Sequence, residues 1–194
     1  MENKEKYIAE IALQQFAKYG FGKTTMQDVA QAARISRQTL YNHVANKNDL
    51  LTLVANHYFA EIFQRCEDAL EKASTLSEAL DCFITHFIIE PWHTIKAIPE
   101  AEEFETTSND IIGDEISRAN IKKAIMIEKA IITYTDTDAD INPAQLASFF
   151  CATATGIKTA TQDENTLQDL SFTLKQSLMI LAGNHPKSSI ASVE

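Results

Sequence analysis

Glycine, proline and cysteine are scarce in this chain, with 5 Gly, 4 Pro and 3 Cys among 194 residues. Few turn-forming residues and no sustained alternation of polar and apolar residues argue against a β-rich fold. Cys66, Cys82 and Cys151 are far apart, odd in number and without metal-ligand spacing, which argues against a disulfide framework or a zinc site. We expect an all-α protein with three reduced thiols, a redox switch being the alternative for the cysteines.

Long apolar runs are also missing. No segment approaches 18 uninterrupted apolar residues, and the charged opening over residues 1–6 is not followed by the apolar core of a secretory signal. We therefore expect no membrane partner and a cytoplasmic protein. The sequence shows no glycine-rich phosphate loop, nucleophile elbow or plausible triad, so we expect no enzyme activity and no cofactor.

Basic charge is in short supply, since 17 lysines and arginines face 27 aspartates and glutamates and the net charge is −10. This is the wrong sign for a protein that adsorbs to nucleic acid through charge alone. The distribution is uneven, because residues 1–60 carry a net charge of +2 and the remainder a net charge of −12. Any affinity for DNA must come from a few placed contacts near the N-terminus.

Two short helices joined by a tight turn are predicted between residues 24 and 44. Thr24, with Gln27 three residues later, fits a capping box at the start of the first helix. That helix is expected to stop near Arg34, and Ser36 is a suitable N-cap for the second. The pattern indicates a helix-turn-helix, whose second helix can enter a DNA major groove.

The second helix has two different faces. At 100° per residue, Leu40 and Val44 fall on one side, while Gln38 and Asn42 fall on the opposite side. The core is expected to hold the first face and leave the second free to contact bases. A solvated amphipathic helix would explain an isolated stripe of this kind as well.

The neighbouring segments favour the DNA-binding interpretation. Residues 4–19 have the pattern of an amphipathic helix that ends at Gly20, a common residue just past a helix C-terminus. Asn46 is placed to cap a long connecting helix that begins at Lys47. Three helices followed by a long connector are typical of a DNA-binding head.

A series of ordered residues then matches a known pattern. These are Gly20-Phe21-Gly22-Lys23-Thr24-Thr25, Asp28-Val29-Ala30, Ala33, Ser36, Thr39-Leu40-Tyr41-Asn42-His43 and Lys47-Asn48-Asp49-Leu50-Leu51. The series closely resembles the N-terminal domain of TetR-family transcriptional regulators. Two positions depart from the family pattern: Arg34 stands where a turn glycine is usual, which predicts a positive φ, and Val44 replaces the more usual Phe.

Residues on the second helix and around it are the predicted DNA contacts. Gln38 and Asn42 project away from the core side, and Arg37 has the reach for a guanine. Tyr41, His43 and Lys47 flank this face, and the free amides after Thr24 are expected to seat a phosphate. The full predicted set is Thr24, Thr25, Arg37, Gln38, Thr39, Tyr41, Asn42, His43 and Lys47.

The rest of the chain is predicted to be helical, with nine helices in all and no internal repeat. A helix that starts at Thr75 is expected to stop at Pro91, and a broken stretch follows over residues 92–107. One of Ser108, Asn109 or Asp110 is expected to cap a helix that reaches Tyr134.

The final helices complete the predicted organisation. Asn142-Pro143 is expected to begin the eighth helix, and Thr166 begins a ninth that Gly183 ends. We predict a helix-turn-helix DNA-binding domain over residues 1–46, a helical effector-binding and dimerisation domain over residues 47–183, and a flexible tail over residues 184–194.

The last two helices suggest a dimer. The ninth carries leucines at coiled-coil-like spacing, namely Leu167, Leu170, Leu174, Leu178 and Leu181, and a second apolar stripe with Phe172 and Met179. The eighth, residues 143–160, is rich in small residues that permit close approach. Two ordinary core helices of a monomer are the alternative. The family resemblance implies that both helices pair with their symmetry mates as a four-helix bundle.

A ligand pocket is expected around the broken stretch. Trp92, Phe104 and Met126 are candidate lining residues, although these side chains serve a packed core equally well. The resemblance implies a homodimeric repressor that reads a palindromic operator. A small effector, whose identity the sequence does not give, is expected to change the spacing of the two heads and release the DNA.

An enzyme is the second hypothesis for function. Helical bundles can hold a carboxylate metal site built on two Glu-x-x-His pairs. This chain has one such spacing, from Glu90 to His93, and Pro91 lies inside it. We expect no metal at this position.

Overall fold

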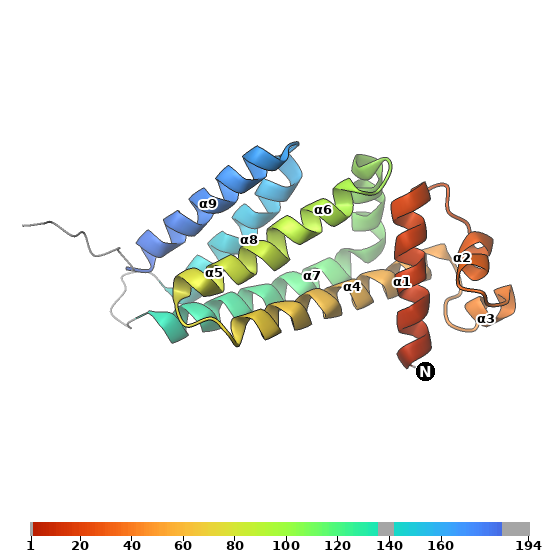
Figure 1. The fold of residues 1–194 in the computed structure, drawn as a ribbon, viewed down its shortest axis with the longest axis horizontal. Coiled ribbons are helices and arrows are strands. Elements are labelled where there is room, and N and C mark those ends of the chain that lie inside the picture. The colour runs from red at the N-terminus through yellow and green to blue at the C-terminus, as the bar shows by residue number, and fades with distance from the viewer. Residues whose placement is uncertain (1, 136–141, 184–194) are drawn as a thin grey trace, which may run out of the picture. The chain divides into compact units, whose positions relative to one another are not determined.

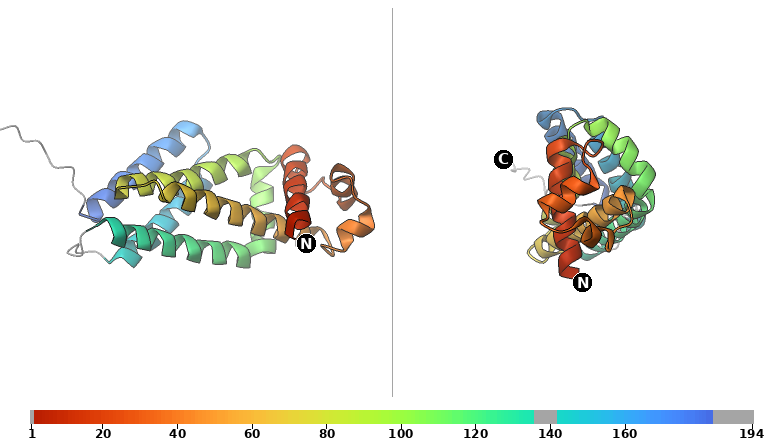
Figure 2. Two further views of the ribbon diagram at one scale, coloured as in Figure 1. Left: turned by 60° about the horizontal axis from the view of Figure 1, so that its bottom comes forward. Right: turned by 90° about the vertical axis from the view of Figure 1, so that its right-hand side faces the viewer.

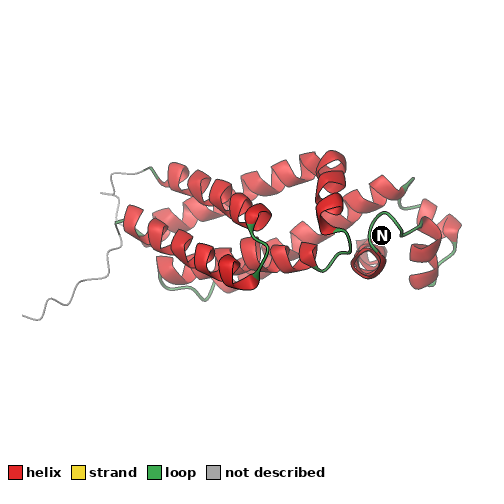
Figure 3. Ribbon diagram, turned by 90° about the horizontal axis from the view of Figure 1, so that it is seen from above, coloured by secondary structure: helices red, strands yellow, loops and turns green. Residues whose placement is uncertain are grey.

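The computed structural model describes residues 2–135 and 142–183, and all elements in these ranges are helices (Figure 1, Figure 3). They are α1 (Glu2–Tyr19), α2 (Met26–Ala32), α3 (Arg37–Tyr41), α4 (Lys47–Leu70), α5 (Leu76–Ile84), the π-helical turn η1 (Thr85–Ile89), α6 (Glu90–Lys96), α7 (Ala101–Tyr134), α8 (Pro143–Ala160) and α9 (Glu164–Leu181). The all-α prediction is confirmed. The tail predicted for residues 184–194 lies outside the described residues.

Contacts divide the chain into two compact units. We call residues 1–65 and 90–119 the head unit, and residues 66–89 and 120–194 the body unit. The division differs from the predicted boundary after residue 46, because the first part of α4, the whole of α6 and the first part of α7 pack with the N-terminal helices. The head unit therefore contains the three N-terminal helices together with parts of the chain that follow them.

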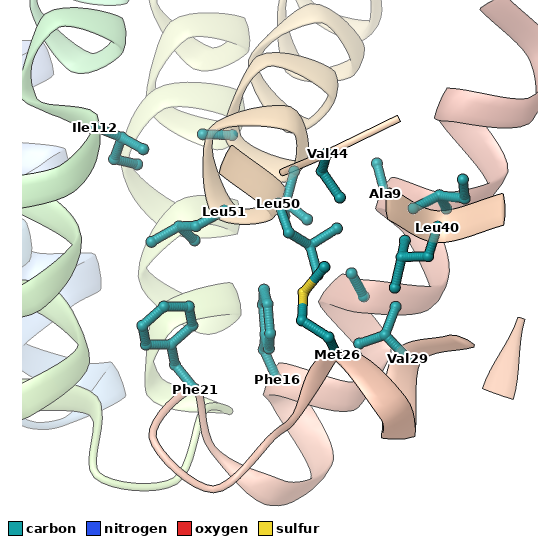
Figure 4. Packing of buried hydrophobic residues seen from close by; sticks show 14 of the residues in the cluster. Ala9, Phe16, Phe21, Met26, Val29, Leu40, Val44, Leu50, Leu51 and Ile112 are labelled. Carbon is teal, nitrogen blue, oxygen red and sulfur yellow. The ribbon is translucent and has the colours of Figure 1, made fainter. Parts of the chain in front are cut away.

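One apolar core holds the head unit together. Side chains from α1, α2, α3, α4 and α7 point toward one another, with Phe16, Leu40 and Leu50 fully buried (Figure 4). Phe21 makes edge-to-face contacts with Phe16 and with Phe104 of α7, at ring-centroid distances of 5.1 and 6.0 Å. This core fixes the short helices α2 and α3, which are too short to be stable alone.

Predicted helix boundaries are wrong at Pro91, at Ser108 and at the start of α9. Pro91 is the second residue of α6 and does not stop a helix, because the π-helical turn η1 runs directly into α6 and keeps the chain helical through the proline. The chain breaks later, between Lys96 and Ala101, around Pro99. Ser108 is not a cap, because α7 has already begun and the Ser108 hydroxyl donates to the Glu105 carbonyl within it.

The third boundary is the start of α9. Asp163 is its N-cap and accepts from the Thr166 amide at 2.9 Å, so the helix begins before the predicted start at Thr166. The N-cap of α8 is Asn142, as predicted, and accepts from the Ala144 amide at 2.8 Å. Gly183 follows α9 at φ 76°, which agrees with its predicted place past the helix end.

The body unit has its own aromatic core. Phe83 of α5 stacks on Phe87 of η1 with ring centroids 5.7 Å apart, and meets Phe150 of α8 edge-on at 6.2 Å. Helices α8 and α9 lie side by side (Figure 2). Lys175 of α9 donates to both carboxylate oxygens of Asp81 on α5 at 2.6 Å. In the described part of the chain, none of the helices has the length and apolar character that crossing a membrane requires.

Candidate nucleic-acid interface

The start of α2 is fixed by Thr25 and Asp28, one position later than predicted. The Thr25 hydroxyl accepts from the Asp28 amide at 3.2 Å, and the Asp28 carboxylate accepts from the Thr25 amide at 2.8 Å. Hydrogen bonds from Thr25 lower the pKa of the Asp28 carboxyl. This reciprocal capping box replaces the predicted pair of Thr24 and Gln27. It lies at the N-terminus of α2, where we expected the free amides to bind a phosphate.

Thr24 takes part in the fold instead. Its side chain is 2% exposed and its hydroxyl donates to the Gly20 carbonyl at 2.8 Å. A hydroxyl that is buried and hydrogen-bonded in this way is not available to a phosphate, so Thr24 leaves the set of candidate side-chain contacts. Thr25 is exposed and stays in it.

The turn between α2 and α3 is a Schellman motif. The Ile35 amide donates to the Ala30 carbonyl at 3.0 Å and the Arg34 amide to the Gln31 carbonyl at 3.1 Å. Arg34 has φ 53°, which confirms the positive φ predicted for this position. The motif ends α2 and sets the direction in which α3 leaves the turn.

Two buried side chains anchor α3 and its following turn. Leu40 is fully buried and Val44 is buried, both in the core of the head unit (Figure 4). Ser36 caps the helix, as predicted, and accepts from the Thr39 amide at 3.0 Å. One face of α3 is therefore fixed by packing and its first turn by a cap.

The opposite face of α3 is polar and open to solvent. Arg37, Gln38 and Asn42 are exposed, and the Gln38 amide donates to the Asn42 side-chain oxygen at 3.1 Å. The Arg37 guanidinium lies 5.8 Å from the centre of the Tyr41 ring. Such amide pairs and arginines provide the donors and acceptors that read base edges in a major groove.

Residues that flank this face are tied to the rest of the head unit. Nδ1 of His43 lies 3.4 Å from a Glu5 carboxylate oxygen on α1. The Lys47 ammonium donates to the Gly22 carbonyl at 3.1 Å and lies 4.4 Å from the centre of the Phe21 ring, and burial lowers its pKa. The first contact ties His43 to α1, and the other two hold Lys47 next to the loop before α2.

One ion pair near this loop has no signal in the sequence. Lys23 donates to Glu100 at 2.8 Å, and Glu100 stands at φ 60° in the break between α6 and α7. The two residues are 77 positions apart, so neither local spacing nor helical periodicity points to them. The pair raises the pKa of Lys23, because its ammonium is stabilised by the carboxylate.

The predicted effector residues do not come together within one unit. Phe104 packs in the core of the head unit against Phe21. Trp92 is buried in the head unit, and Met126, half-buried, belongs to the body unit.

The predicted leucine seam of α9 is split between two environments. Leu167, Leu174 and Leu178 are buried inside the body unit, so their assignment to a partner-facing seam is wrong. Leu170 and Leu181 are exposed, as is Phe172, whose side chain is 63% exposed. Phe149 and Gly156 of α8 are exposed as well.

Comparisons with known proteins agree with this geometry. The family model for bacterial regulatory proteins of the tetR family matches residues 8–54. The HTH-type transcriptional regulator YuxN of Bacillus subtilis is 37% identical over 65 residues, a match that covers 34% of this chain and 22% of YuxN. The HTH-type transcriptional repressor DhaR of Mycobacterium sp. is 23% identical over 169 residues, which cover 78% of each chain.

Solved structures extend the likeness to the whole fold. A TetR-family transcriptional regulator from Rhodococcus sp. superimposes with a TM-score of 0.70 at 16% identity, over 93% of this chain and 99% of that one. The sequence match over residues 8–54 includes α2, α3 and the turn that joins them, and the structural match includes the helices that follow. Residues 8–54 therefore match the DNA-binding part of the TetR family of bacterial regulatory proteins, and the chain shares the fold of a solved TetR-family regulator.

Proposed function

We propose that this protein is a transcriptional regulator that binds a palindromic DNA operator as a homodimer and releases it when a small molecule binds. The observation that carries the proposal is the face of α3 formed by Arg37, Gln38 and Asn42, which is exposed while Leu40 fixes the helix from beneath. The relatives that are named as repressors, DhaR among them, favour repression.

Base reading is assigned to Arg37, Gln38 and Asn42. The hydrogen bond between Gln38 and Asn42 orients both amides before DNA arrives, which reduces the entropy cost of binding. Thr25, Thr39, Tyr41, His43 and Lys47 are assigned to the sugar-phosphate backbone, which sets register without reading sequence. With a net charge of −10, the chain relies on these few contacts rather than on bulk attraction.

Dimerisation is assigned to the exposed side of α8 and α9. Phe149, Leu170, Phe172, Ile180 and Leu181 are large apolar side chains that these two helices leave exposed. Small residues beside Phe149, such as Ala152 and Gly156, permit a partner helix to approach closely. Burial of these side chains against a second copy would form a four-helix bundle and hold two heads at a fixed spacing.

Effector binding is assigned to the helices that follow the head core. Trp92 of the head unit and Met126 of the body unit are separate candidates, and no shared pocket is assigned to them. The effector shifts the equilibrium only through a preference for the conformation that does not fit DNA.

The enzyme hypothesis gains no support. The Glu90 carboxylate of the Glu-x-x-His spacing forms an ion pair with Arg65 at 3.0 Å, and the relatives are regulators.

A selection experiment tests the proposal. The full chain is mixed with random-sequence duplexes, bound DNA is recovered and sequenced, and the enriched motif is inspected for two-fold symmetry. The proposal predicts two inverted half-sites whose centres are about one helical turn or a multiple apart. Enrichment of no motif would contradict it.

A further inference from the structure

A second set of chemically active side chains lies in the head unit away from α3. Glu10 belongs to α1, and His57 and Glu61 belong to α4. Nε2 of His57 is 3.3 Å from a Glu61 carboxylate oxygen and 3.6 Å from a Glu10 carboxylate oxygen. The three donor atoms all lie within 4.8 Å of one another. We propose that these residues bind a divalent first-row transition-metal ion.

The spacing of the donor atoms suits an ion at their centre. Metal bonds of about 2.1 Å place neighbouring ligand atoms roughly 3 to 4 Å apart in tetrahedral or octahedral sites. His57 and Glu61 are four residues apart on one helix, which puts both side chains on the same face. Glu10 approaches from a second helix, so the donors converge from two sides.

The imidazole nitrogen supplies an independent indication. Nε2 of His57 is a buried polar atom that makes no hydrogen bond to the described residues, although two carboxylates lie nearby. The two carboxylates make only long contacts with this nitrogen, at 3.3 and 3.6 Å, whereas buried polar atoms normally have a hydrogen-bond partner. A metal ion would accept its lone pair and satisfy it.

The donor types indicate which class of ion fits. One imidazole nitrogen and two carboxylate oxygens suit Zn²⁺, Co²⁺, Ni²⁺ or Fe²⁺, whereas Mg²⁺ and Ca²⁺ prefer oxygen ligands only. Both carboxylates are partly exposed, so an ion can reach them from solvent. Water would complete the coordination of a site with three protein ligands.

Lys6 is the competitor for this position. Its ammonium lies 3.3 Å from the Glu61 carboxylate and 3.8 Å from the Glu10 carboxylate. The side chain is 53% exposed, so it can move into solvent when an ion enters. Metal binding must displace this ammonium, and removal of Lys6 should therefore strengthen binding.

A bound ion would join two functional parts of the head unit. Glu10 is on the helix whose Glu5 contacts His43, and His57 and Glu61 are on the helix that Lys47 begins. The ion would hold α1 against α4. We expect it to stabilise the folded head, because it binds only the folded arrangement of the three donors.

Cobalt titration of the full chain tests the site. Co²⁺ is added to the protein while visible absorption is recorded, and Zn²⁺ is then added to displace it. His57→Gln and Glu61→Gln should each weaken Co²⁺ binding by at least about tenfold, since each removes a ligand. Lys6→Met should strengthen it by about fivefold, because it removes a like charge a few ångströms from the ion. His93→Gln, at an exposed histidine of α6, is the matched control and should bind as the unmodified protein does.

Two sets of outcomes are distinguishable. Saturable cobalt bands that weaken in His57→Gln and strengthen in Lys6→Met, with a rise in melting temperature on metal addition, would support the site. Absence of saturable binding, equal affinity in His57→Gln and the unmodified protein, or a thiolate-to-cobalt band from the cysteines would each overturn it. If His57→Gln or Glu61→Gln fails to fold, Lys6→Met still tests the site, because this variant keeps all three ligands and should bind cobalt more strongly.

Discussion

Arg34 stands at φ 53°, a conformation that a residue with a Cβ adopts at a cost of about 1 kcal/mol. The cost is tolerated because the Schellman motif at this residue connects α2 to α3. The sequence predicts this feature from one departure in an otherwise familiar pattern.

The first prediction concerns this strain. Arg34→Asn should raise the free energy of unfolding by several tenths to about 1 kcal/mol, since asparagine tolerates the left-handed region better than arginine does. Arg34→Ala keeps the Cβ and should give no such gain. Chemical denaturation of both variants measures the difference, and equal stability of the two would contradict the presence of strain at this residue.

The second prediction concerns Lys47, whose ammonium is held by the Gly22 carbonyl. Lys47→Ala should weaken binding to specific and non-specific DNA alike. It should also reduce the slope of log affinity against log salt by about one for each phosphate that the lysine no longer neutralises. Lys72→Ala, at an exposed lysine outside the head unit, serves as the control. An unchanged slope in Lys47→Ala would remove this residue from the interface.

Single residues are predicted well where local rules decide their place. The roles of Ser36, Leu40 and Gly20 follow from capping preference, periodicity and the need for positive φ. Thr24 is misassigned as a side-chain contact to DNA, because the burial of its hydroxyl against the Gly20 carbonyl has no local sequence signal.

Among the elements, α2 is a short helix that begins with a reciprocal capping box. It has seven residues, and the Thr25 and Asp28 pair satisfies its first amides. Gly20 before it and the Schellman motif after it leave α2 little freedom to shift. Loss of the cap should therefore be felt across the head unit.

The third prediction concerns this cap and pH. Thr25→Ala should lower the free energy of unfolding by about 1 kcal/mol near neutral pH. Hydrogen bonds lower the folded-state pKa of Asp28, so its capping contribution is present above the ordinary carboxyl pKa and is lost as pH falls through the lowered value. The stability gap between Thr25→Ala and the unmodified protein should narrow in acid. A gap that is constant with pH in thermal melts would contradict this.

The helix boundaries show how far element prediction reaches. The helix over residues 143–160 is predicted to the residue, because Asn142 and Pro143 are strong start signals. The prediction fails at Pro91 because η1 and α6 keep the chain helical through a proline, and a π-helical turn has no sequence signal as clear as a cap.

At the scale of the whole molecule, binding to a palindrome requires a second copy of the chain. The leucines of α9 are predicted to form one seam, yet three of the five lie inside the body unit. Periodicity alone does not distinguish a core face from an interface, since both are apolar and recur at helical spacing. The exposed Phe172 is the better candidate for contact with a partner.

The fourth prediction follows from this exposure. Phe172→Glu should yield monomers at micromolar concentration and weaken operator binding by about 100-fold or more, because two linked heads gain a high effective concentration that separate heads lack. Gln14→Glu adds the same charge at an exposed polar position of α1 in the head unit and should remain dimeric. Light scattering that finds a dimer for Phe172→Glu would contradict the proposed interface.

The most direct test of the central claim is operator affinity measured for the unmodified protein and for Asn42→Ala. Fluorescence anisotropy gives the dissociation constant on the selected palindrome and on palindromes changed at one symmetric pair of bases. We expect Asn42→Ala to cost about 1 to 3 kcal/mol per contacted base pair and to relax preference at a single symmetric pair of positions. Equal weakening on every duplex, or no weakening, would contradict recognition of bases by α3.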